Sequence, residues 1–235
     1  MRFAQRTYTK ELLDAEDIPF ADIRQNMQEL NTINTWLGGH TITLKGFKKL
    51  LSGKKEITVC EIGCGGGDNL AAIAKWGLKN NKKISCIGID WKESCISVAR
   101  ENPVFCENDQ WIFSDYAKIR FDKKPDIIFS SLFCHHFTEE ELVFQLAWMR
   151  DNSLIGFFIN DLHRHWLAYD SITLLTKWFS SSYLVKQDAP LSVARGFLKN
   201  EWLQICEKAG IQGAEISWQW AFRHLIIYRH AAYKH

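Results

Sequence analysis

The sequence predicts an α/β fold in which a mostly parallel sheet carries helices on both faces. Short β-branched runs alternate with helical segments, which is typical of βαβ units. Glycines follow the first such run at once, and the run 126–130 is apolar enough for a strand buried on both faces. No repeat and no proline-rich linker divides the 235 residues, so we expect one domain.

We divide this domain into four parts. Residues 1–55 form an N-terminal helical cap and 56–160 form the core. Residues 161–197 form a helical insertion that acts as a lid, and 198–235 supply a last helix and an edge hairpin. In the cap, apolar residues recur at helical spacing until two glycines stop the pattern. They are Ile23, Met27, Leu30, Ile33 and Leu37, followed by Gly38 and Gly39. A second, short helix is expected over 44–51.

In the core, segments with the periodicity of a helix alternate with β-rich runs. Thr138 and Glu141 have the spacing of a capping box, so a helix is expected to begin there. Two further helices are expected over 70–78 and 93–100. The β-rich runs predict strands over 57–62, 84–90, 110–113, 126–130 and 154–159.

The last third first interrupts this alternation and then completes the sheet. An amphipathic run in the insertion places Ala168, Ile172, Leu175 and Phe179 on one helical face. A helix is expected over 198–209, ended by Gly210. Two final strands, around 214–220 and 222–229, would form an antiparallel hairpin and bring the sheet to seven strands.

Composition excludes several classes of protein. The chain has 29 Lys and Arg against 27 Asp and Glu, and a net charge of +2 is too mild to indicate nucleic acid or an anionic membrane. No stretch approaches the ~20 apolar residues of a membrane span, and the first residues lack the apolar centre of a signal peptide. Seven cysteines without a paired framework favour a reducing compartment, so we expect a cytoplasmic protein.

A glycine-rich turn follows the first predicted strand. It reads Glu61-Ile62-Gly63-Cys64-Gly65-Gly66-Gly67-Asp68. Glycines between a strand and a helix let a ligand approach the backbone and the free N–H groups of the helix. The dinucleotide fingerprint requires a glycine at the sixth position, where this sequence has Asp68 or, counted from Gly65, Leu70. The spacing therefore argues against a nicotinamide oxidoreductase.

The acid at 61 with glycines at 63, 65 and 67 resembles the E/D-x-G-x-G-x-G loop of class I S-adenosylmethionine (SAM)-dependent methyltransferases. The resemblance implies a Rossmann-like sheet whose core binds SAM and releases S-adenosylhomocysteine (SAH), with no metal expected. Asp90, at the end of the next strand, would bind the ribose hydroxyls, and Trp91 would flank the adenine. Asp115 would accept from the adenine amino group. The full set of cofactor-binding residues implied is Glu61, Gly63, Cys64, Gly65, Gly67, Asp90, Trp91, Ser114, Asp115, Tyr116, Ser131 and Leu132.

Two histidine pairs follow the fourth and fifth strands, where an acceptor would bind beside the cofactor. Methyl transfer from a sulfonium needs a base only when the acceptor carries a proton. His163 and His136 are the candidate catalytic bases. The alternatives are that the histidines at 135 and 136 only shape their loop and that those at 163 and 165 only bond neighbouring backbone. Candidate substrate-binding residues are His135, His165, Tyr169 and Arg195, the last by a forked contact or, alternatively, as a surface ion pair.

No metal site is expected from these residues. His163 and His165 lack an obvious third ligand, and Cys60 with Cys64 has no matching second cysteine pair.

The insertion is rich in aromatic residues, and two interpretations stay open. They would either form the walls of an apolar acceptor pocket or pack the insertion onto the core. The residues are Trp166, Tyr169, Trp178, Phe179 and Tyr183.

Three further segments resemble a bacterial subgroup that is similar to the ubiquinone and menaquinone biosynthesis methyltransferases. They read Trp36-Leu37-Gly38-Gly39, Asp161-Leu162-His163-Arg164 and Leu191-Ser192-Val193-Ala194-Arg195-Gly196-Phe197. This resemblance implies a small hydrophobic or aromatic acceptor of polyketide or quinone type. We expect a monomer or homodimer.

Other functions remain as alternatives. Methyltransferases of exocyclic amines in RNA or DNA use a proline-containing loop after the fourth strand, where this chain has Ser-Leu-Phe-Cys-His-His. No basic stripe interleaved with aromatics is visible, so no nucleic-acid partner is expected. A protein methyltransferase and a non-catalytic cofactor-binding protein stay open.

Overall fold

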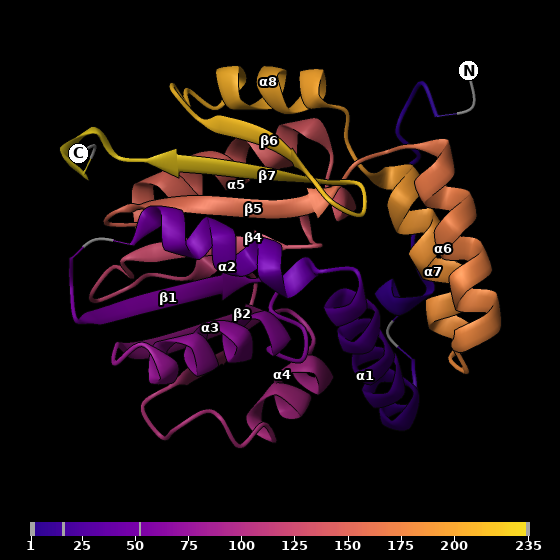
Figure 1. The fold of residues 1–235 in the computed structure, drawn as a ribbon, viewed down its shortest axis with the longest axis horizontal. Helices are drawn as coiled ribbons and strands as arrows, with labels where there is room; N and C mark the ends of the chain where they lie inside the picture. The colour runs from indigo at the N-terminus through magenta and orange to yellow at the C-terminus, as the bar shows by residue number, and fades with distance from the viewer. Residues whose placement is uncertain (1–2, 16, 52, 234–235) are drawn as a thin grey trace.

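The computed structural model describes residues 3–15, 17–51 and 53–233. Its centre is one seven-stranded sheet in the order β3-β2-β1-β4-β5-β7-β6 (Figure 1). The strands from β1 to β5 pair in parallel, and β7 is antiparallel to both β5 and β6. The seven-stranded α/β sheet with its antiparallel C-terminal hairpin is therefore confirmed. The strands are β1 Glu56–Ile62, β2 Lys83–Asp90, β3 Gln110–Phe113, β4 Ile127–Ser131, β5 Gly156–Leu162, β6 Glu215–Gln219 and β7 Arg223–Arg229.

Helices cover both faces of the sheet, as predicted. One apolar core joins the sheet to α2, α3 and α4 through buried residues such as Phe47, Ile73 and Ile96. The other joins it to α5 and α8 through buried residues such as Leu146 and Trp202. The helices are α1 Phe20–Trp36, α2 Gly39–Leu50, α3 Asp68–Lys79, α4 Glu93–Arg100, α5 Glu139–Asn152, α6 Trp166–Phe179, α7 Tyr183–Arg195 and α8 Lys199–Lys208.

The capping box that opens α5 is confirmed. The Thr138 hydroxyl accepts from the Glu141 amide at 3.3 Å, and the Glu141 carboxylate accepts from the Thr138 amide at 2.7 Å. The predicted limits of α2 were wrong. The glycines end α1 as expected, but Gly38 has a left-handed φ of +73° and α2 begins directly after it, at Gly39. α2 is consequently longer than the predicted 44–51.

The insertion forms two helices, α6 and α7, joined by a short turn. Figure 1 shows them beside α1, at the end of the sheet where the parallel strands terminate. The predicted face of α6 is the inner one at Ala168, Ile172 and Leu175, but the prediction was wrong for Phe179, which is exposed at the end of the helix. The sequence did not indicate the break into two helices.

The first described residues do not form part of a helical cap, which corrects that prediction for 3–15. This segment, which we call the N-terminal strap, has only a short 3-10 turn at Leu12–Asp14. The Arg6 guanidinium donates to the carbonyls of Arg195 at 2.8 Å and His135 at 3.1 Å. The amides of Leu12 and Leu13 donate to the Asp188 carboxylate on α7. These contacts hold the strap across α7 and the loop after β4.

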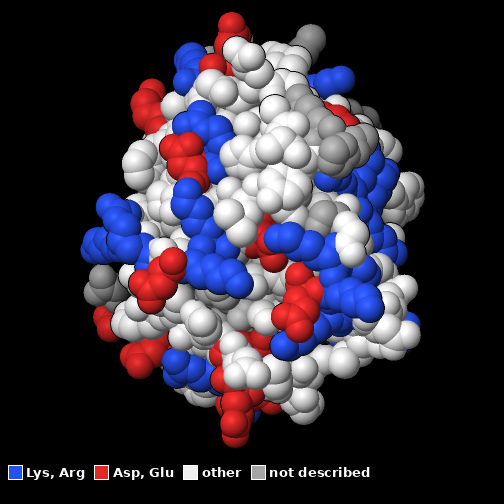
Figure 2. All heavy atoms as spheres, turned by 90° about the vertical axis from the view of Figure 1, so that its left-hand side faces the viewer, with Lys and Arg blue, Asp and Glu red and all other residues white. Residues whose placement is uncertain are grey.

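The opposite end of the molecule carries mixed charge. Figure 2 shows lysines and arginines interspersed with acidic side chains on that face. Within the described ranges 3–15, 17–51 and 53–233, no helix has both the length and the apolar composition needed to cross a membrane.

Candidate active site

A cavity of about 1280 Å³ lies where the parallel strands end. Glu61 of β1, Asp90 of β2, Ser131 of β4 and Leu162 of β5 all line it. Pockets for one drug-sized molecule enclose about 300–1,000 Å³. The volume therefore suits two ligands side by side. We call the part lined by 61–69, 89–91 and 114–116 the glycine-loop end.

The glycine loop needs its glycines for two reasons. Gly63 has a φ of +67°, and a Cβ there would lie 2.3 Å from the Phe133 ring. Gly67 has a φ of +74°, and a Cβ there would lie 2.8 Å from Trp111. L side chains rarely adopt such φ values, so any other residue would strain the turn. Gly67 precedes the first residue of α3 and, unlike the other predicted loop residues, does not line the cavity.

Glu61 is buried with one unpaired oxygen. Its Oε1 accepts from Asn69 Nδ2 at 3.2 Å, whereas no described residue bonds Oε2. Burial, reinforced by the nearby Asp68, raises the pKa of Glu61 well above its usual value. A buried polar atom without a partner is costly. A ligand that offers a donor here would remove that cost.

Asp90 fixes the glycine loop to β2. Its Oδ2 accepts from the Gly65 amide and its Oδ1 from the Lys92 amide, both at 2.9 Å. Burial raises the pKa of Asp90 in spite of these two bonds. A carboxylate has about four acceptor positions, so lone pairs remain for hydroxyl donors. Trp91 follows at the cavity wall with an exposed ring.

The remaining predicted cofactor residues also line the cavity. Asp115 Oδ1 accepts from the Ala117 amide at 2.9 Å and caps a single 3-10 turn. Leu132 takes a left-handed φ of +53° directly after β4. The set placed at the wall is Glu61, Gly63, Cys64, Gly65, Asp90, Trp91, Ser114, Asp115, Tyr116, Ser131 and Leu132.

Glu11, Asp14, His135 and His136 form a second polar group on the cavity wall, which we call the histidine corner. His135 Nε2 lies 3.6 Å from Glu11 Oε1, and His136 Nε2 lies 3.7 Å from Glu11 Oε2. His136 Nδ1 lies 3.5 Å from Asp14 Oδ1. Behind the corner, His135 Nδ1 is hydrogen-bonded at 2.8 Å to Asp161, which is fully buried.

In the histidine corner, the charged histidines and carboxylates stabilise one another. Burial alone would lower the pKa of His135, but Asp161 and Glu11 outweigh it and raise this pKa to about 9. Burial alone would raise the pKa of Glu11, but His135 and His136 outweigh it, so the pKa lies below its usual value. The same competition lowers the pKa of Asp161. The corner therefore keeps ionised carboxylates beside the cavity.

Four predicted residues lie outside the cavity wall. His163 Nδ1 accepts from the Trp218 indole at 3.2 Å, and His165 Nδ1 accepts from the Leu167 amide and caps α6. Tyr169 packs on the Phe3 ring, with centroids 5.2 Å apart. Arg195 is buried and donates to the carbonyls of Thr9, His135 and His136, so its contacts fix the strap and the loop after β4.

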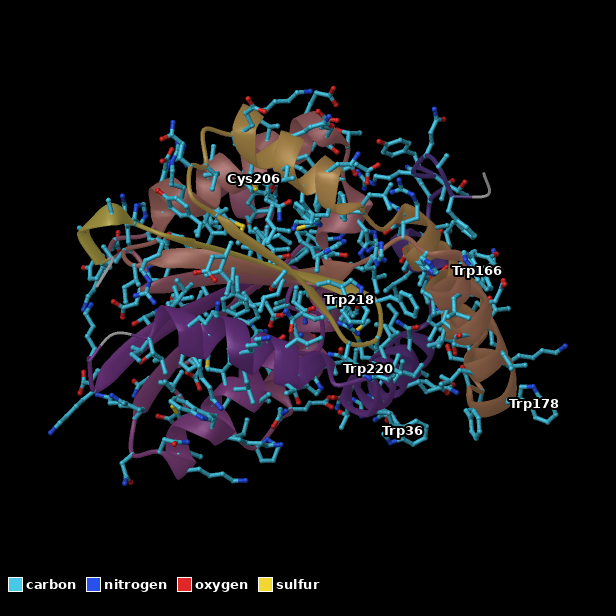
Figure 3. All side chains as sticks on the ribbon, turned by 45° about the horizontal axis from the view of Figure 1, so that its top comes forward. Trp36, Trp166, Trp178, Cys206, Trp218 and Trp220 are labelled. Carbon is cyan, nitrogen blue, oxygen red and sulfur yellow. The ribbon has the colours of Figure 1, made fainter. Side chains whose placement is uncertain are left out.

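The aromatic residues of the insertion do not wall the cavity, and that interpretation is wrong. Trp178 and Phe179 are each 74% exposed. Figure 3 shows Trp166 and Trp178 on the outer side of the insertion, pointing away from the sheet. The wall is made instead by smaller side chains on the inner face of α6, namely Ala168, Ser171, Ile172 and Leu175. Most of these aromatics therefore do not pack onto the core either.

Sequence reasoning missed Glu11, Asp14 and Arg223 as cavity residues. Arg223 is buried on β7 and donates to Asn34 Oδ1 at 3.0 Å, and burial lowers its pKa to about 10. The two strap acids stand three residues apart beside Leu12 and Leu13, a spacing that suits one turn. Nothing in that pattern indicates a partner more than 120 residues along the chain.

Comparison of the chain with known proteins identifies a family. Residues 53–210, more than half of the chain, match a protein-family model described as a methyltransferase domain. No match was found among curated proteins.

The fold is similar to solved methyltransferases. A plantazolicin methyltransferase in complex with SAH has 16% identity and a TM-score of 0.64, over 90% of this chain and 95% of that one. Human N-acetylserotonin methyltransferase in complex with SAM has 15% identity and a TM-score of 0.62, over 90% of this chain and 56% of that one. A Nostoc punctiforme protein described as an O-methyltransferase has 14% identity and a TM-score of 0.60, over 87% of this chain and 60% of that one. At these identities the likeness concerns the fold.

Proposed function

The chain belongs to the methyltransferase-domain family, and on this premise we propose that it transfers a methyl group from SAM to a small apolar acceptor. The observation that carries the proposal is the single cavity of about 1280 Å³ that joins the glycine-loop end to the histidine corner. The glycine-loop end offers hydrogen-bond acceptors for a nucleoside. The other end offers the polar histidine corner within an apolar wall. Such a cavity suits a two-substrate reaction between its ends.

The glycine-loop end fits SAM. Asp90 has free lone pairs for the two ribose hydroxyls, and the unpaired Glu61 Oε2 would accept from the cofactor's amino group. Asp115 and Trp91 stand at the wall where the adenine would lie. The plantazolicin and human enzymes with a similar fold were solved with SAH and SAM, which supports this assignment.

The remainder of the cavity fits an apolar acceptor with one heteroatom. Its wall includes Ile33, Leu37, Ile172, Leu175 and Val193. The histidine corner lines the same cavity, and we assign the acceptor heteroatom to its His135 and His136. His163 lies outside the wall, so among the two candidate bases His136 is the one within reach of a substrate. The fold is shared with plantazolicin and N-acetylserotonin methyltransferases, which supports a small-molecule acceptor.

The chemistry needs alignment more than activation. SAM supplies a methyl group on a sulfonium that is already activated for displacement. The chain's own residues would hold the acceptor heteroatom in line with that methyl group and exclude water with the apolar wall. SAM held at the glycine-loop end would supply the methyl group by cleavage of its carbon–sulfur bond and leave as SAH, and His136 would take the proton that a hydroxyl or amine acceptor loses.

Calorimetric titration with SAM, SAH and NADH tests the proposal. We expect saturable binding of SAM and SAH and none of NADH. Asp90→Ala should weaken SAM binding by about 100-fold, because each lost hydrogen bond to a charged group costs about 1.5–3 kcal/mol. Asp122→Ala, an exposed acid away from the cavity, is the matched control and should bind like the wild type. Binding of NADH alone would overturn the proposal.

Binding establishes the cofactor, and an acceptor screen must follow. The readout is SAH formed on mixing SAM with phenolic, enolic and amine acceptors of polyketide or quinone type. Transfer to RNA or to a protein and not to any small molecule would contradict the assigned acceptor class.

We also place the protein in the cytoplasm. All seven cysteines are free thiols and six of them are buried, which supports a reducing compartment.

A further inference from the structure

Three potential metal-ligand atoms of the histidine corner lie close together. The atoms that Glu11, His135 and His136 present lie within 4.8 Å of one another. His135 Nε2 lies 3.6 Å from Glu11 Oε1 and His136 Nε2 lies 3.7 Å from Glu11 Oε2, both longer than a well-formed hydrogen bond. Two ligands that share an ion at about 2.1 Å, with an angle of about 110–120°, lie about 3.4–3.6 Å apart. The separations of 3.6 and 3.7 Å, one to each oxygen of Glu11, are compatible with an ion held between the carboxylate and the two imidazoles.

We propose that Glu11, His135 and His136 bind one divalent first-row transition ion at the acceptor end of the cavity. Two imidazoles and one carboxylate suit Zn²⁺ and its neighbours, whereas Mg²⁺ prefers oxygen ligands throughout. Three protein ligands leave at least one coordination position for another molecule.

Residues behind the corner already orient these ligands. His135 Nδ1 is bonded at 2.8 Å to Asp161, which leaves Nε2 directed at Glu11. Asp161 is itself held by the amides of Phe133 and Cys134. Ser192 donates to Glu11 Oε1 at 2.7 Å. A carboxylate on the outer nitrogen of a ligating histidine is the usual support of a metal site.

Hydrogen bonds between the strap and α7 position Glu11 in the site. Glu11 reaches the corner because the amides of Leu12 and Leu13 are bonded to Asp188 and Arg195 Nη1 to the Thr9 carbonyl. The three ligands therefore hold their positions through contacts to the strap, β5 and α7. A surface cluster of ion pairs would not need this support.

The role of the ion rests on the proposed function. A sulfonium methyl group needs no metal for its activation. An ion at this position would act on the acceptor in place of His135 and His136 themselves, by binding the acceptor oxygen and favouring loss of its hydroxyl proton to solvent before methyl transfer. The proposal of binding itself does not depend on this role.

Titration of the untagged, chelator-treated protein with Co²⁺ tests the proposal through the visible absorption of bound cobalt. We expect one Co²⁺ per chain, displaced by Zn²⁺ and not by Mg²⁺. Glu11→Gln and His136→Ala should each weaken binding by more than about 100-fold, because loss of an outer-shell partner alone costs about 10–100-fold. His165→Ala is the matched control, since that histidine lies outside the corner, and it should leave the affinity unchanged.

Calorimetric binding of SAH by every variant reports that the fold and the glycine-loop end are intact. Equal Co²⁺ affinity in wild type, Glu11→Gln and His136→Ala, or no saturable binding by the wild type, would overturn the metal site. Absence of SAH binding by the wild type would instead count against the proposed function, so the two failures are distinguishable.

Discussion

The two ends of the cavity are built in different ways. The glycine-loop end comes from the ends of adjacent strands β1, β2 and β3, and its key residues follow their strands directly. The histidine corner combines the N-terminal strap with the loop after β4, supported by β5 and α7. Local sequence therefore specifies the first end, whereas only long-range hydrogen bonds assemble the second. The predictions below separate these two kinds of construction, beginning with the largest expected effect.

Loss of Asp161 should disrupt the histidine corner most. Asp161→Ala removes the acceptor of the Phe133 and Cys134 amides. It also leaves the buried His135 without the carboxylate that is hydrogen-bonded to its Nδ1. Breaking a buried pair in this way costs about 3–5 kcal/mol. Urea denaturation should show this loss in the free energy of unfolding, and Asp161→Asn should lose less because its amide oxygen still accepts. Equal stability of all three proteins would contradict the buried network.

Acid should destabilise the folded protein through His224, which lies on β7. Burial, with a contribution from His163, lowers the pKa of His224 to about 4. The unfolded histidine titrates at about 6.5, so between these values the unfolded chain binds more protons and stability falls as pH falls. The full effect is roughly 3 kcal/mol and is reached below pH ~4.

Thermal unfolding at a series of pH values measures this effect. His224→Phe should flatten the dependence of the melting temperature on pH between 6.5 and 4 relative to the wild type. The same slope in both proteins would assign the acid sensitivity to another group.

The glycine loop should tolerate no Cβ at Gly63. Gly63→Ala must adopt a left-handed φ and displace the Phe133 ring, which would lie 2.3 Å away, so we expect a loss of about 1–3 kcal/mol and weakened SAM binding. Gly53→Ala is the matched control, because a Cβ there meets nothing within 4 Å. Differential scanning calorimetry and SAM titration of both variants decide this. If Gly63→Ala behaved like Gly53→Ala, the loop would not have the described geometry.

The smallest effects should come from the outer face of α6. Trp178→Ala changes an exposed ring and should alter stability by no more than about 0.5 kcal/mol, with SAH and acceptor binding unchanged. Leu175→Ala, three residues earlier on the same helix, removes part of the cavity wall and should raise the KM for the acceptor while leaving that for SAM unchanged. A larger change in the KM for the acceptor in Trp178→Ala than in Leu175→Ala would contradict the assignment of the inner and outer faces of α6.

Sequence alone located most of the glycine-loop end. Glu61, Asp90 and Asp115 each stand within two residues of the end of a predicted strand, and parallel strands bring their carboxyl ends to one edge. The periodicity of α6 likewise placed Ala168, Ile172 and Leu175 on the face that lines the cavity, although it also placed the exposed Phe179 there. In both cases the relevant distance is a few residues, so local geometry was enough.

Tertiary structure decided the rest. Glu11 and Asp14 belong to a strap without regular helix, and no local pattern connects them with His135 and His136. Arg195 was read as a substrate contact because its type suits anions, but its donors are taken by backbone carbonyls. The sequence leaves open whether the tryptophans of the insertion wall the pocket or pack onto the core, because aromatics usually bury area, but α6 presents them outward. Such outcomes depend on which side chains meet after folding. Local propensity therefore determined the sheet and the glycine loop, and long-range packing alone determined the histidine corner.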